Sequence, residues 1–393
     1  MADALSYDFI APQQIVFGWG RRREVGRLAK QLGGRAFLVS GLPAAVSDAV
    51  LDEIAGWLRQ ASVEPVVLAT LLHEPEVADV DRIAAEARAR GIGEGDLLVG
   101  IGGGAAMDLA KATAAMAVNR ESVTVKDCLE NVGRDLKLMV SPLPIMAMPT
   151  TAGTGAEATR NAVISCYDPP FKKSLRDNGL MPRVALVDPE LTVTTPAETT
   201  AASGMDAITQ LIESYVSKKT QPIPRALAVQ GLRMAVPAMA EAVERPEHRP
   251  AREAMSHAAL LSGMALANSG LGMAHGVAAA LGTHCRVPHG VACAVMLPVA
   301  IRNNLAVCRD AFARLGHLVF GLPTKDQEAA AEAFAEKIEQ LCDRVKLPRK
   351  LSEVGVRREQ IADLVRDSRG SSMSGNPRRL SDDELAEILE RLL

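Results

Sequence analysis

The two halves of the chain differ in hydrophobic patterning, and this difference constrains the fold more than any other feature. In the first half, short apolar stretches indicate buried strands at 36–41, 64–70, 96–104 and 144–150. Amphipathic stretches predict helices at 47–62, 76–91 and 105–118. Strands that alternate with helices through short turns are typical of a parallel, doubly wound α/β sheet.

The second half has helical periodicity almost throughout, beginning just after "RVALVDPEL" (183–191). The predicted helices span 197–217, 222–244, 249–283, 288–303, 308–320, 324–345, 357–367 and 381–393. The last of them starts with Ser381 followed by Glu384, a capping-box pattern. We therefore predict an α/β domain over 1–190 and an all-helical domain over 191–393. A cleft between such domains is the usual place for a ligand.

Composition limits the possible partners. With 393 residues, 48% of them hydrophobic, the chain is long enough to bury two separate cores. A net charge of −3 gives no electrostatic case for binding nucleic acid or a membrane surface. No signal-peptide pattern and no apolar run of about 18 residues is present, so we expect no membrane span. The six cysteines are scattered without CxxC pairs, which favours reduced thiols and a cytoplasmic location.

The segment "GIGGGAAMDLAK" (100–111) is the strongest local signal for a ligand. Gly102, Gly103 and Gly104 end a predicted strand and open a predicted helix. Without side chains there, backbone N–H groups can approach a pyrophosphate, and the helix N-terminus adds positive potential. The alternative is a tight turn with close packing, because glycine-rich turns after strands are common.

A second loop of small residues, "MPTTAGTGAEAT" (148–159), follows the next predicted strand. Its hydroxyl groups belong to Thr150, Thr151 and Thr154, and they could bind a phosphate or a ribose. Alone, this loop could equally be a turn with internally satisfied hydroxyls. Two such loops at the carboxyl ends of parallel strands are expected to meet at one sheet edge, where nucleotides bind.

Candidate metal ligands lie in the helical half. Asp206 and Gln210, in "SGMDAITQLIESY", stand one turn apart on a helix face. His275, His284 and His289 are concentrated in "GMAHGVAAALGTHCRVPHG" (272–290). Imidazoles and an aspartate suit Zn²⁺ or Fe²⁺. Taken singly, each histidine is more often a hydrogen-bonded core residue than a ligand.

Taken together, these segments resemble the iron-containing, group III alcohol dehydrogenase family. The similarity runs in order from "FGWG" (17–20) to the C-terminus. It implies a Rossmann-like dinucleotide-binding domain followed by an all-helical metal and substrate domain, the dehydroquinate synthase-like fold. It also implies reversible hydride transfer between NAD or NADP and a small alcohol, aldehyde or ketone, with a divalent metal polarising the substrate oxygen. At least a homodimer is implied.

The resemblance assigns cofactor roles to residues of the first half. Glycines 102–104 and Asp108 would hold the pyrophosphate region, with Thr150, Thr151 and Thr154 near the phosphates and nicotinamide. Lys173 matches a lysine that approaches the ribose. Gly41 stands where the family usually has an aspartate that discriminates against the 2′-phosphate, so we expect NADPH to be tolerated.

The family's metal ligands are an aspartate, a histidine four residues later and two further histidines. Asp206, His275 and His289 match three of these positions, and Gln210 stands at the fourth. An amide oxygen is a weaker ligand than imidazole for Fe²⁺ or Zn²⁺, so metal occupancy is open. Ala279 replaces a histidine used in proton relay, for which His284 is a candidate substitute. Two further departures are Ala105, usually serine, and Glu74, usually asparagine.

These departures leave other functions open. One is a metal-independent reductase of the maleylacetate reductase type, in which polar side chains polarise the carbonyl. Another is a lyase of the dehydroquinate synthase type, although the motifs favour the alcohol dehydrogenase branch. The third is a catalytically silent nucleotide-binding protein. Turnover with a panel of aldehydes, before and after chelation, distinguishes them.

Overall fold

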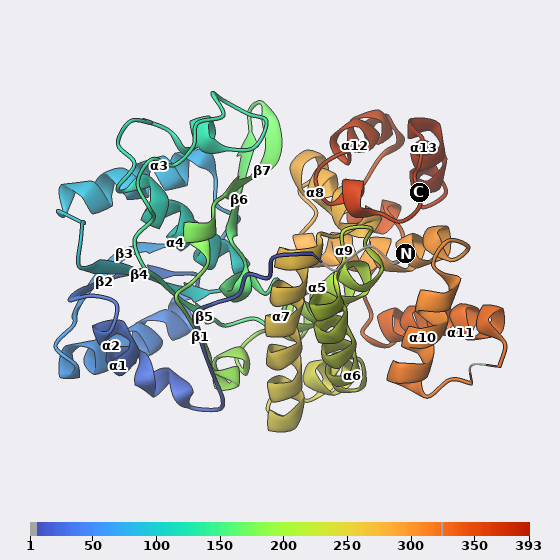
Figure 1. The fold of residues 1–393 in the computed structure, drawn as a ribbon, viewed down its shortest axis with the longest axis horizontal. Coiled ribbons are helices and arrows are strands. Elements are labelled where there is room, and N and C mark those ends of the chain that lie inside the picture. The colour runs from blue at the N-terminus through green and yellow to red at the C-terminus, as the bar shows by residue number, and fades with distance from the viewer. Residues whose placement is uncertain (1–5, 324) are drawn as a thin grey trace. The chain divides into compact units, whose positions relative to one another are not determined.

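Two compact units make up the protein in a computed structural model that describes residues 6–323 and 325–393. One unit is continuous in sequence and covers residues 12–195. The other combines residues 196–393 with the N-terminal segment that ends at Ala11. Figure 1 shows the first unit as mixed strands and helices, in blue to green, and the helices of the second in yellow-green to red.

The α/β unit is built on a six-stranded sheet with the order β1-β8-β5-β4-β2-β3. Every neighbouring pair in it is parallel, which confirms the predicted parallel sheet. Its strands are β1 (Gln14–Phe17), β2 (Arg35–Ser40), β3 (Glu64–Thr70), β4 (Asp96–Gly102), β5 (Ile145–Pro149) and β8 (Val184–Val187).

Helices cover both faces of this sheet, and each face has its own core. The helices are α1 (Val25–Lys30), α2 (Ala44–Gln60), α3 (Val77–Ala89) and α4 (Gly104–Met116). Along β2, Phe37 and Val39 enter one hydrophobic cluster, whereas Ala36 and Leu38 enter the other. Since successive strand residues point to opposite faces, both faces are buried, and the strand reads as one continuous apolar run.

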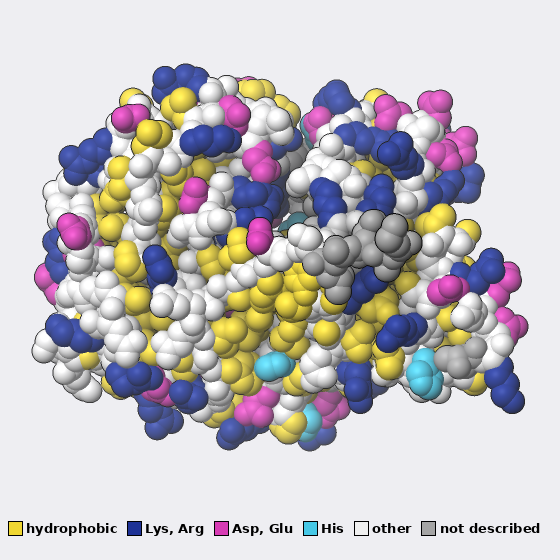
Figure 2. Space-filling view, in the orientation of Figure 1, with side chains coloured by type: hydrophobic (Ala, Val, Ile, Leu, Met, Phe, Trp, Pro, Cys, Tyr) yellow, Lys and Arg dark blue, Asp and Glu magenta, His cyan; other side chains and the backbone are white. Residues whose placement is uncertain are grey.

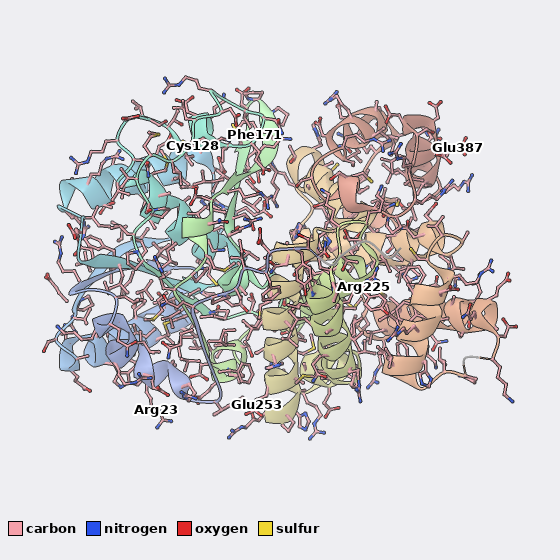
Figure 3. All side chains as sticks on the ribbon, viewed as in Figure 1. Arg23, Cys128, Phe171, Arg225, Glu253 and Glu387 are labelled. Carbon is pink, nitrogen blue, oxygen red and sulfur yellow. The ribbon has the colours of Figure 1, made fainter. Side chains whose placement is uncertain are left out.

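An antiparallel hairpin, β6 (Asn161–Tyr167) with β7 (Pro170–Arg176), stands apart from the main sheet. Neither strand was among the expected elements, because lysines and other polar residues interrupt the apolar pattern. Phe171 of β7 is buried in the same cluster against which Cys128 packs, and both side chains are labelled in Figure 3. The hairpin thereby attaches to the core beside α4.

The second unit is helical. Its helices are α5 (Ala197–Val216), α6 (Pro222–Glu244), α7 (Arg249–Ser269), α8 (Met273–Cys285), α9 (His289–Asn304), α10 (Arg309–Phe320), α11 (Gln327–Arg344), α12 (Ile361–Asp367) and α13 (Asp382–Glu390). Within the described ranges, none of the helices combines the length and apolar character needed to cross a membrane.

The single helix predicted over 249–283 is wrong, because the chain forms two helices there. Gly270 has a φ of 66° and follows the last residue of α7, where its N–H is donated to the carbonyl of Leu266. A positive φ with a ψ of −179° lies outside the helical region and ends the helix, and glycine adopts it without steric cost. The apolar periodicity continues across the break, which is why the pattern alone did not show it. The break places His275 in the first turn of a new helix.

The N-terminal segment is tied to α7 by one side chain. Ile10 donates its backbone N–H to Oδ1 of Asn268 at 2.7 Å, and Asn268 Nδ2 donates back to the Ile10 carbonyl at 2.8 Å. The amide side chain therefore pairs with the backbone as a neighbouring strand would. This explains why the first residues group with a unit whose remainder begins at Pro196.

Surface charge agrees with the composition. On the face seen in Figure 2, Lys and Arg side chains are interspersed with Asp and Glu side chains, without a field of a single sign. Such a surface gives no electrostatic footprint for a polyanion on this face.

Candidate functional site

One face of α5 carries three buried polar side chains. Asp206, Gln210 and Glu213 follow one another at intervals of four and three residues and are 1%, 3% and 4% exposed. That spacing places them on the same side of a helix. Three buried polar groups in a row need partners, because an unpaired buried carboxylate is costly. Their partners come from α7, α8 and α9.

Two histidine side chains lie close to the carboxylate of Asp206. Nε2 of His275 lies 3.1 Å from Oδ1 of Asp206, and Nε2 of His289 lies 3.8 Å from the same oxygen. The centroids of the two imidazole rings are 5.6 Å apart. Burial alone would raise the pKa of Asp206, but His289 and His275 outweigh it and hold that pKa below its usual value. The structure thus brings together three residues that the sequence suggested as ligands.

Glu213 fixes the orientation of His275 and was missed by sequence analysis. Oε2 of Glu213 lies 2.7 Å from Nδ1 of His275. Because an ionised carboxylate can only accept, Nδ1 of His275 donates to Glu213 and Nε2 donates to Asp206. With Nδ1 held as a donor, loss of the Nε2 proton would leave the lone pair of Nε2 as the metal-binding group. A carboxylate behind a histidine is the usual arrangement around metal-bound imidazoles. The signal was present in the sequence as the spacing of seven residues between Asp206 and Glu213.

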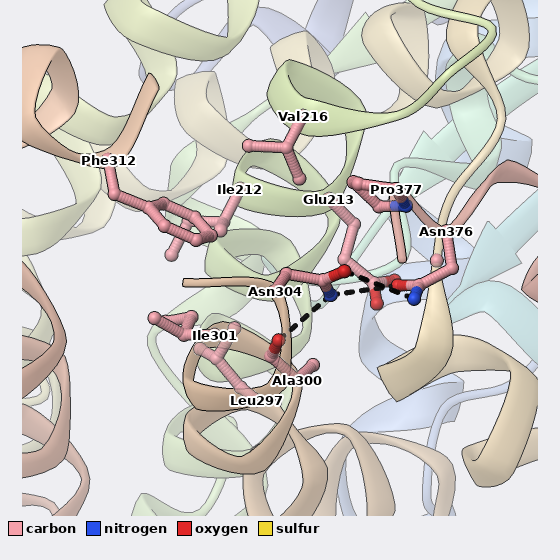
Figure 4. Close-up of a pocket in the computed structure, with 11 residues that line it drawn as sticks. Ile212, Glu213, Val216, Leu297, Ala300, Ile301, Asn304, Phe312, Asn376 and Pro377 are labelled. Atoms are coloured by element: carbon pink, nitrogen blue, oxygen red, sulfur yellow. Dashed lines mark hydrogen bonds between the residues drawn. The ribbon is translucent and has the colours of Figure 1, made fainter. Parts of the chain in front are cut away.

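The same carboxylate caps the start of α8. Oε1 of Glu213 accepts the N–H of Ala274 at 2.6 Å, and Asn376 Oδ1 accepts the N–H of Met273 at 3.1 Å. Asn376 is in turn hydrogen-bonded to Asn304, as Figure 4 shows beside Glu213. A Cβ at Gly272 would lie 2.8 Å from Glu213 Oε1, so this approach requires glycine. The helix start and the histidine are therefore held by one network.

Gln210 is engaged at both ends of its amide. Its Nε2 donates to Oδ1 of Asp206 at 3.4 Å, and its Oε1 accepts the hydroxyl of Ser262 in α7 at 2.8 Å. In this arrangement the amide N–H₂, and not the carbonyl oxygen, faces the carboxylate. Gln210 therefore lies at the site, as expected from the sequence, with its oxygen already paired.

Cys293 is the donor that sequence analysis did not select. It follows His289 by one helical turn in α9, is 0% exposed, and its Sγ lies 3.7 Å from His289 Nε2. Among the described residues, ligand atoms of Asp206, His275, His289 and Cys293 all lie within 4.8 Å of one another. Burial raises the pKa of the Cys293 thiol to about 12. A carboxylate, two imidazoles and a thiol form a chemically suitable donor set for a divalent transition metal.

The glycine-rich turn of the α/β unit is closely packed. Gly102 ends β4, and a Cβ built there would lie 2.8 Å from the Ala106 Cβ and 2.9 Å from Cα of Gly41. A Cβ at Gly41 would likewise lie 2.8 Å from Ala106 Cβ. Both positions therefore require glycine for packing alone. Gly103 and Gly104 follow as the N-cap and first residue of α4, whose first N–H groups have no partner inside the helix.

The threonine loop lies against these glycines, as predicted for neighbouring strand ends. A Cβ at Gly103 would be 3.3 Å from Thr151 Oγ1, and one at Gly104 would be 2.8 Å from Thr154 Oγ1. The N–H of Thr150 is donated to the Gly102 carbonyl at 2.9 Å. Backbone N–H groups and hydroxyls thus gather at the N-terminus of α4, a chemically suitable place for a phosphate group.

Comparison with protein families agrees with this geometry in both units. The family described as "Iron-containing alcohol dehydrogenase" matches residues 12–189, and "Fe-containing alcohol dehydrogenase family, C-terminal" matches residues 200–393. The chain belongs to the iron-containing alcohol dehydrogenase family. The resemblance seen in the sequence is thereby confirmed.

Relatives of this iron-containing alcohol dehydrogenase chain are named for their oxidoreductase activities. It is 32% identical to the NAD-dependent methanol dehydrogenase of Bacillus methanolicus over 98% of this chain and 100% of that protein. It is 30% identical to the NADPH-dependent butanol dehydrogenase of Clostridium saccharobutylicum, covering 97% of each. A crystal structure of 1,3-propanediol oxidoreductase superposes with a TM-score of 0.90 at 30% identity, over 99% of this chain and 100% of that one.

Two other residues expected at the nucleotide site of this iron-containing alcohol dehydrogenase have contacts within the α/β unit. The carboxylate of Asp108 accepts the N–H of Val163 at 3.0 Å and lies 3.6 Å from Nζ of the fully buried Lys111. It thus joins α4 to the hairpin. Lys173 lies in β7 opposite Ile164.

The neighbouring residue Lys172 forms an ion pair. Its Nζ lies 2.7 Å from Oε1 of Glu74, the residue that departs from the family's asparagine. Adjacent strand residues point to opposite sides, so Lys173 faces away from this ion pair. Glu74 and Lys172 therefore form a structural ion pair, in which each charge accounts for the presence of the other.

His284, the candidate substitute in proton relay, is bound to another residue. Its Nε2 lies 2.6 Å from Oδ2 of Asp367, and the residue is in the last turn of α8. Ala279 lies in the middle of that helix and offers only its backbone, which accepts the hydroxyl of Thr283 at 2.9 Å. The pairing with Asp367 attaches the end of α8 to α12.

Glu213→Gln is expected to lower metal affinity and kcat/KM by about 10- to 100-fold, the usual effect of removing a partner behind a metal-bound histidine. The amide is neutral and can donate as well as accept, so it no longer fixes the His275 tautomer. Metal content per folded protein and kcat/KM should be measured together. Glu198→Gln, at an exposed position on the same helix, is the control. Unchanged affinity in Glu213→Gln would contradict the positioning role.

Glu157→Gln is expected to stabilise the protein at pH 8 and to leave it unchanged near pH 4.5. Burial raises the pKa of Glu157 from 4.5 to about 7. The folded state therefore binds the proton more tightly, and the stability that this gives is lost as the pH rises from 4.5 through 7. Across that window the folded state loses about 3 kcal/mol of stability. Glutamine does not titrate, so the Glu157→Gln protein does not undergo this loss. Denaturant unfolding at several pH values measures this, with the exposed Glu94→Gln as control. Parallel stability curves for wild type and Glu157→Gln would contradict it.

Proposed function

We propose that this protein is an NAD(P)-dependent alcohol dehydrogenase that interconverts a small alcohol and its aldehyde or ketone with the help of a divalent metal. The observation that carries the proposal is the cluster of Asp206, His275, His289 and Cys293 around one point in a chain of this family. Four mutually close, mostly buried donors are hard to explain as packing, because hydrophobic side chains would fill the same space at lower cost.

The metal-site residues have distinct roles in this proposal. Asp206, His275 and His289 would hold the ion, and Glu213 would keep the Nε2 lone pair of His275 directed at it. A divalent metal there supplies Lewis-acid stabilisation of negative charge on the substrate oxygen. Because Asp206 and His275 are almost fully buried, water is largely excluded, which strengthens every electrostatic interaction at the site.

The nucleotide is proposed to bind at the glycine turn. The N–H groups of Gly103 and Gly104, aligned with the axis of α4, would bind the pyrophosphate, and the hydroxyls of Thr151 and Thr154 would contact the phosphates or the nicotinamide ribose. A nicotinamide bound there would accept hydride at C4 from the alcohol carbon, and the hydroxyl proton would leave to solvent. The balanced products are aldehyde or ketone, reduced nucleotide and one proton.

Acceptance of both nucleotides is proposed from Gly41. This position follows β2, where a carboxylate would bind the ribose and repel a 2′-phosphate. Glycine offers neither interaction, and Ala106 leaves no room for a side chain. One relative is named NAD-dependent and another NADPH-dependent, so both specificities occur among similar chains.

We further propose a cytoplasmic homodimer or larger homo-oligomer. Its six cysteines are all free thiols, as expected in a reducing compartment. A monomer by light scattering would contradict the oligomeric part. Small substrates are proposed because relatives of this length are named for methanol and butanol.

The test measures oxidation of a series of primary alcohols with NAD⁺ and NADP⁺, paired with elemental analysis before and after chelation. We expect activity that falls on chelation and returns with added metal. Full activity in a metal-free sample would favour the metal-independent reductase. Nucleotide binding without turnover under any metal would favour the catalytically silent protein.

A further inference from the structure

The position of Cys293 has no explanation in the metal site that the family resemblance implies. That ligand set contains an aspartate and three histidines, and here one histidine position is Gln210. Cys293 lies one turn beyond His289 on the same side of α9, fully buried, with Sγ 3.7 Å from His289 Nε2. Its sulfur also lies within 4.8 Å of the ligand atoms of Asp206 and His275.

Gln210 is less well placed to act as the fourth ligand. Its oxygen already accepts the Ser262 hydroxyl at 2.8 Å, and its Nε2 donates to Asp206. Coordination through this amide would require it to turn over, with Nε2 then donating to the Ser262 oxygen and the Ser262 proton passing to the Ala259 carbonyl, which lies 2.8 Å away. The thiol needs no such rearrangement, because its sulfur already lies among the three ligand atoms.

We propose that Cys293 is the fourth metal ligand, which makes an Asp–His–His–Cys site that selects zinc-like ions over harder ones. This rests on the proposed metal-assisted function and deepens it by naming the ligand set and the class of metal. Gln210 then acts as a positioning residue that donates to the Asp206 carboxylate. The substitution at 210 is compensated within the site by a residue from another helix.

The chemistry of the donors determines the selectivity. Thiolate and imidazole are ligands that Zn²⁺ and Co²⁺ prefer, whereas Mg²⁺ and Mn²⁺ prefer oxygen. Two imidazoles, one carboxylate and one thiolate match the four-coordinate geometry of zinc, and zinc can add a fifth ligand during a reaction. On binding, the sulfur–metal bond forms as the S–H bond breaks, and the proton leaves to solvent. No oxidation state changes, so no further reactant is required.

The experiment uses the full-length protein, stripped by chelation and reloaded with Co²⁺ as a spectroscopic probe. We expect wild-type protein to show a near-ultraviolet thiolate-to-cobalt charge-transfer band. Cys293→Ser should lose the band and bind Zn²⁺ at least about 100-fold more weakly, a loss at the upper end of that for an outer partner. Cys342→Ser is the matched control, because Cys342 is also fully buried in the helical unit. Gln210→Ala should keep the band.

Each outcome has a defined meaning. A wild-type cobalt protein without the charge-transfer band would overturn the proposal even if Cys293→Ser failed to fold. If that protein also turned over alcohols, metal-assisted function would survive and only the thiolate ligand would be rejected. Zn²⁺ affinity that falls in Gln210→Ala and is unchanged in Cys293→Ser, in a protein without the band, would assign the fourth position to Gln210. Failure of the wild type to bind any metal would reject both proposals.

Discussion

Asp206→Asn is expected to remove the bound metal and to lower kcat/KM by at least about a thousandfold, since losing a single charge-stabilising donor already costs that order. The carboxylate is 1% exposed and is the common neighbour of His275 and His289. Asparagine keeps the shape but removes the negative charge, so two imidazoles would have to bind a cation without it. Nothing else in the ligand cluster supplies a second carboxylate.

The measurement is metal content by elemental analysis together with steady-state kinetics on the same preparation. Asp310→Asn is a suitable control, because Asp310 is an exposed carboxylate in the first turn of α10. We expect Asp310→Asn to match wild type in both readings. An Asp206→Asn protein that retained stoichiometric metal and full turnover would rule out this residue as a ligand.

The second large effect is expected at the nucleotide turn, where Gly104→Val should weaken NADH binding about 10- to 100-fold. A Cβ at Gly104 would lie 2.8 Å from both Oγ1 and Cγ2 of Thr154. Valine adds two further methyl groups, so the threonine loop must move away from the first turn of α4. Overpacking of this kind costs ~1–3 kcal/mol. If this cost falls on the NADH-bound state, it corresponds to the expected loss of about 10- to 100-fold in NADH affinity.

Calorimetric titration of the whole protein with NADH measures this effect, alongside its thermal unfolding temperature. Gly56→Val is the matched control, since a Cβ at Gly56 in α2 meets no atom within 4 Å. We expect the control to bind NADH like wild type. Equal NADH affinity in the Gly104→Val protein would show that the glycine turn is only a packing device.

Burial explains which parts of the fold could be predicted. The strands of the main sheet are buried on both faces, so β2 and β4 appear as continuous apolar runs between amphipathic helices. In contrast, β1 has two exposed residues among four, and the β6–β7 hairpin carries its lysines within the strand. The α7–α8 break depends on the backbone conformation of Gly270, and the periodicity of the side chains does not report it.

The candidate site could be predicted from the sequence only for residues whose type is itself typical of a metal ligand. Histidines and an aspartate attract attention as ligands, and the structure brings Asp206, His275 and His289 together. Cys293 and Glu213 are ordinary in a buried helix, and their importance comes from neighbours that belong to other helices. Their spacing from His289 and Asp206 can be read from the sequence. Such a spacing indicates a shared site only when the residues that face it from neighbouring helices are known.

The division of the helical unit between the two ends of the chain sets an order of events during synthesis. Ile10 is made 258 residues before Asn268, the side chain that holds it. At about 10 residues per second, the segment ending at Ala11 waits roughly 25 s on the ribosome for its partner. The α/β unit is continuous and can fold in that interval, whereas the proposed metal ligands on α8 and α9 are made only after it. We therefore expect loading of the proposed metal to follow folding of the α/β unit.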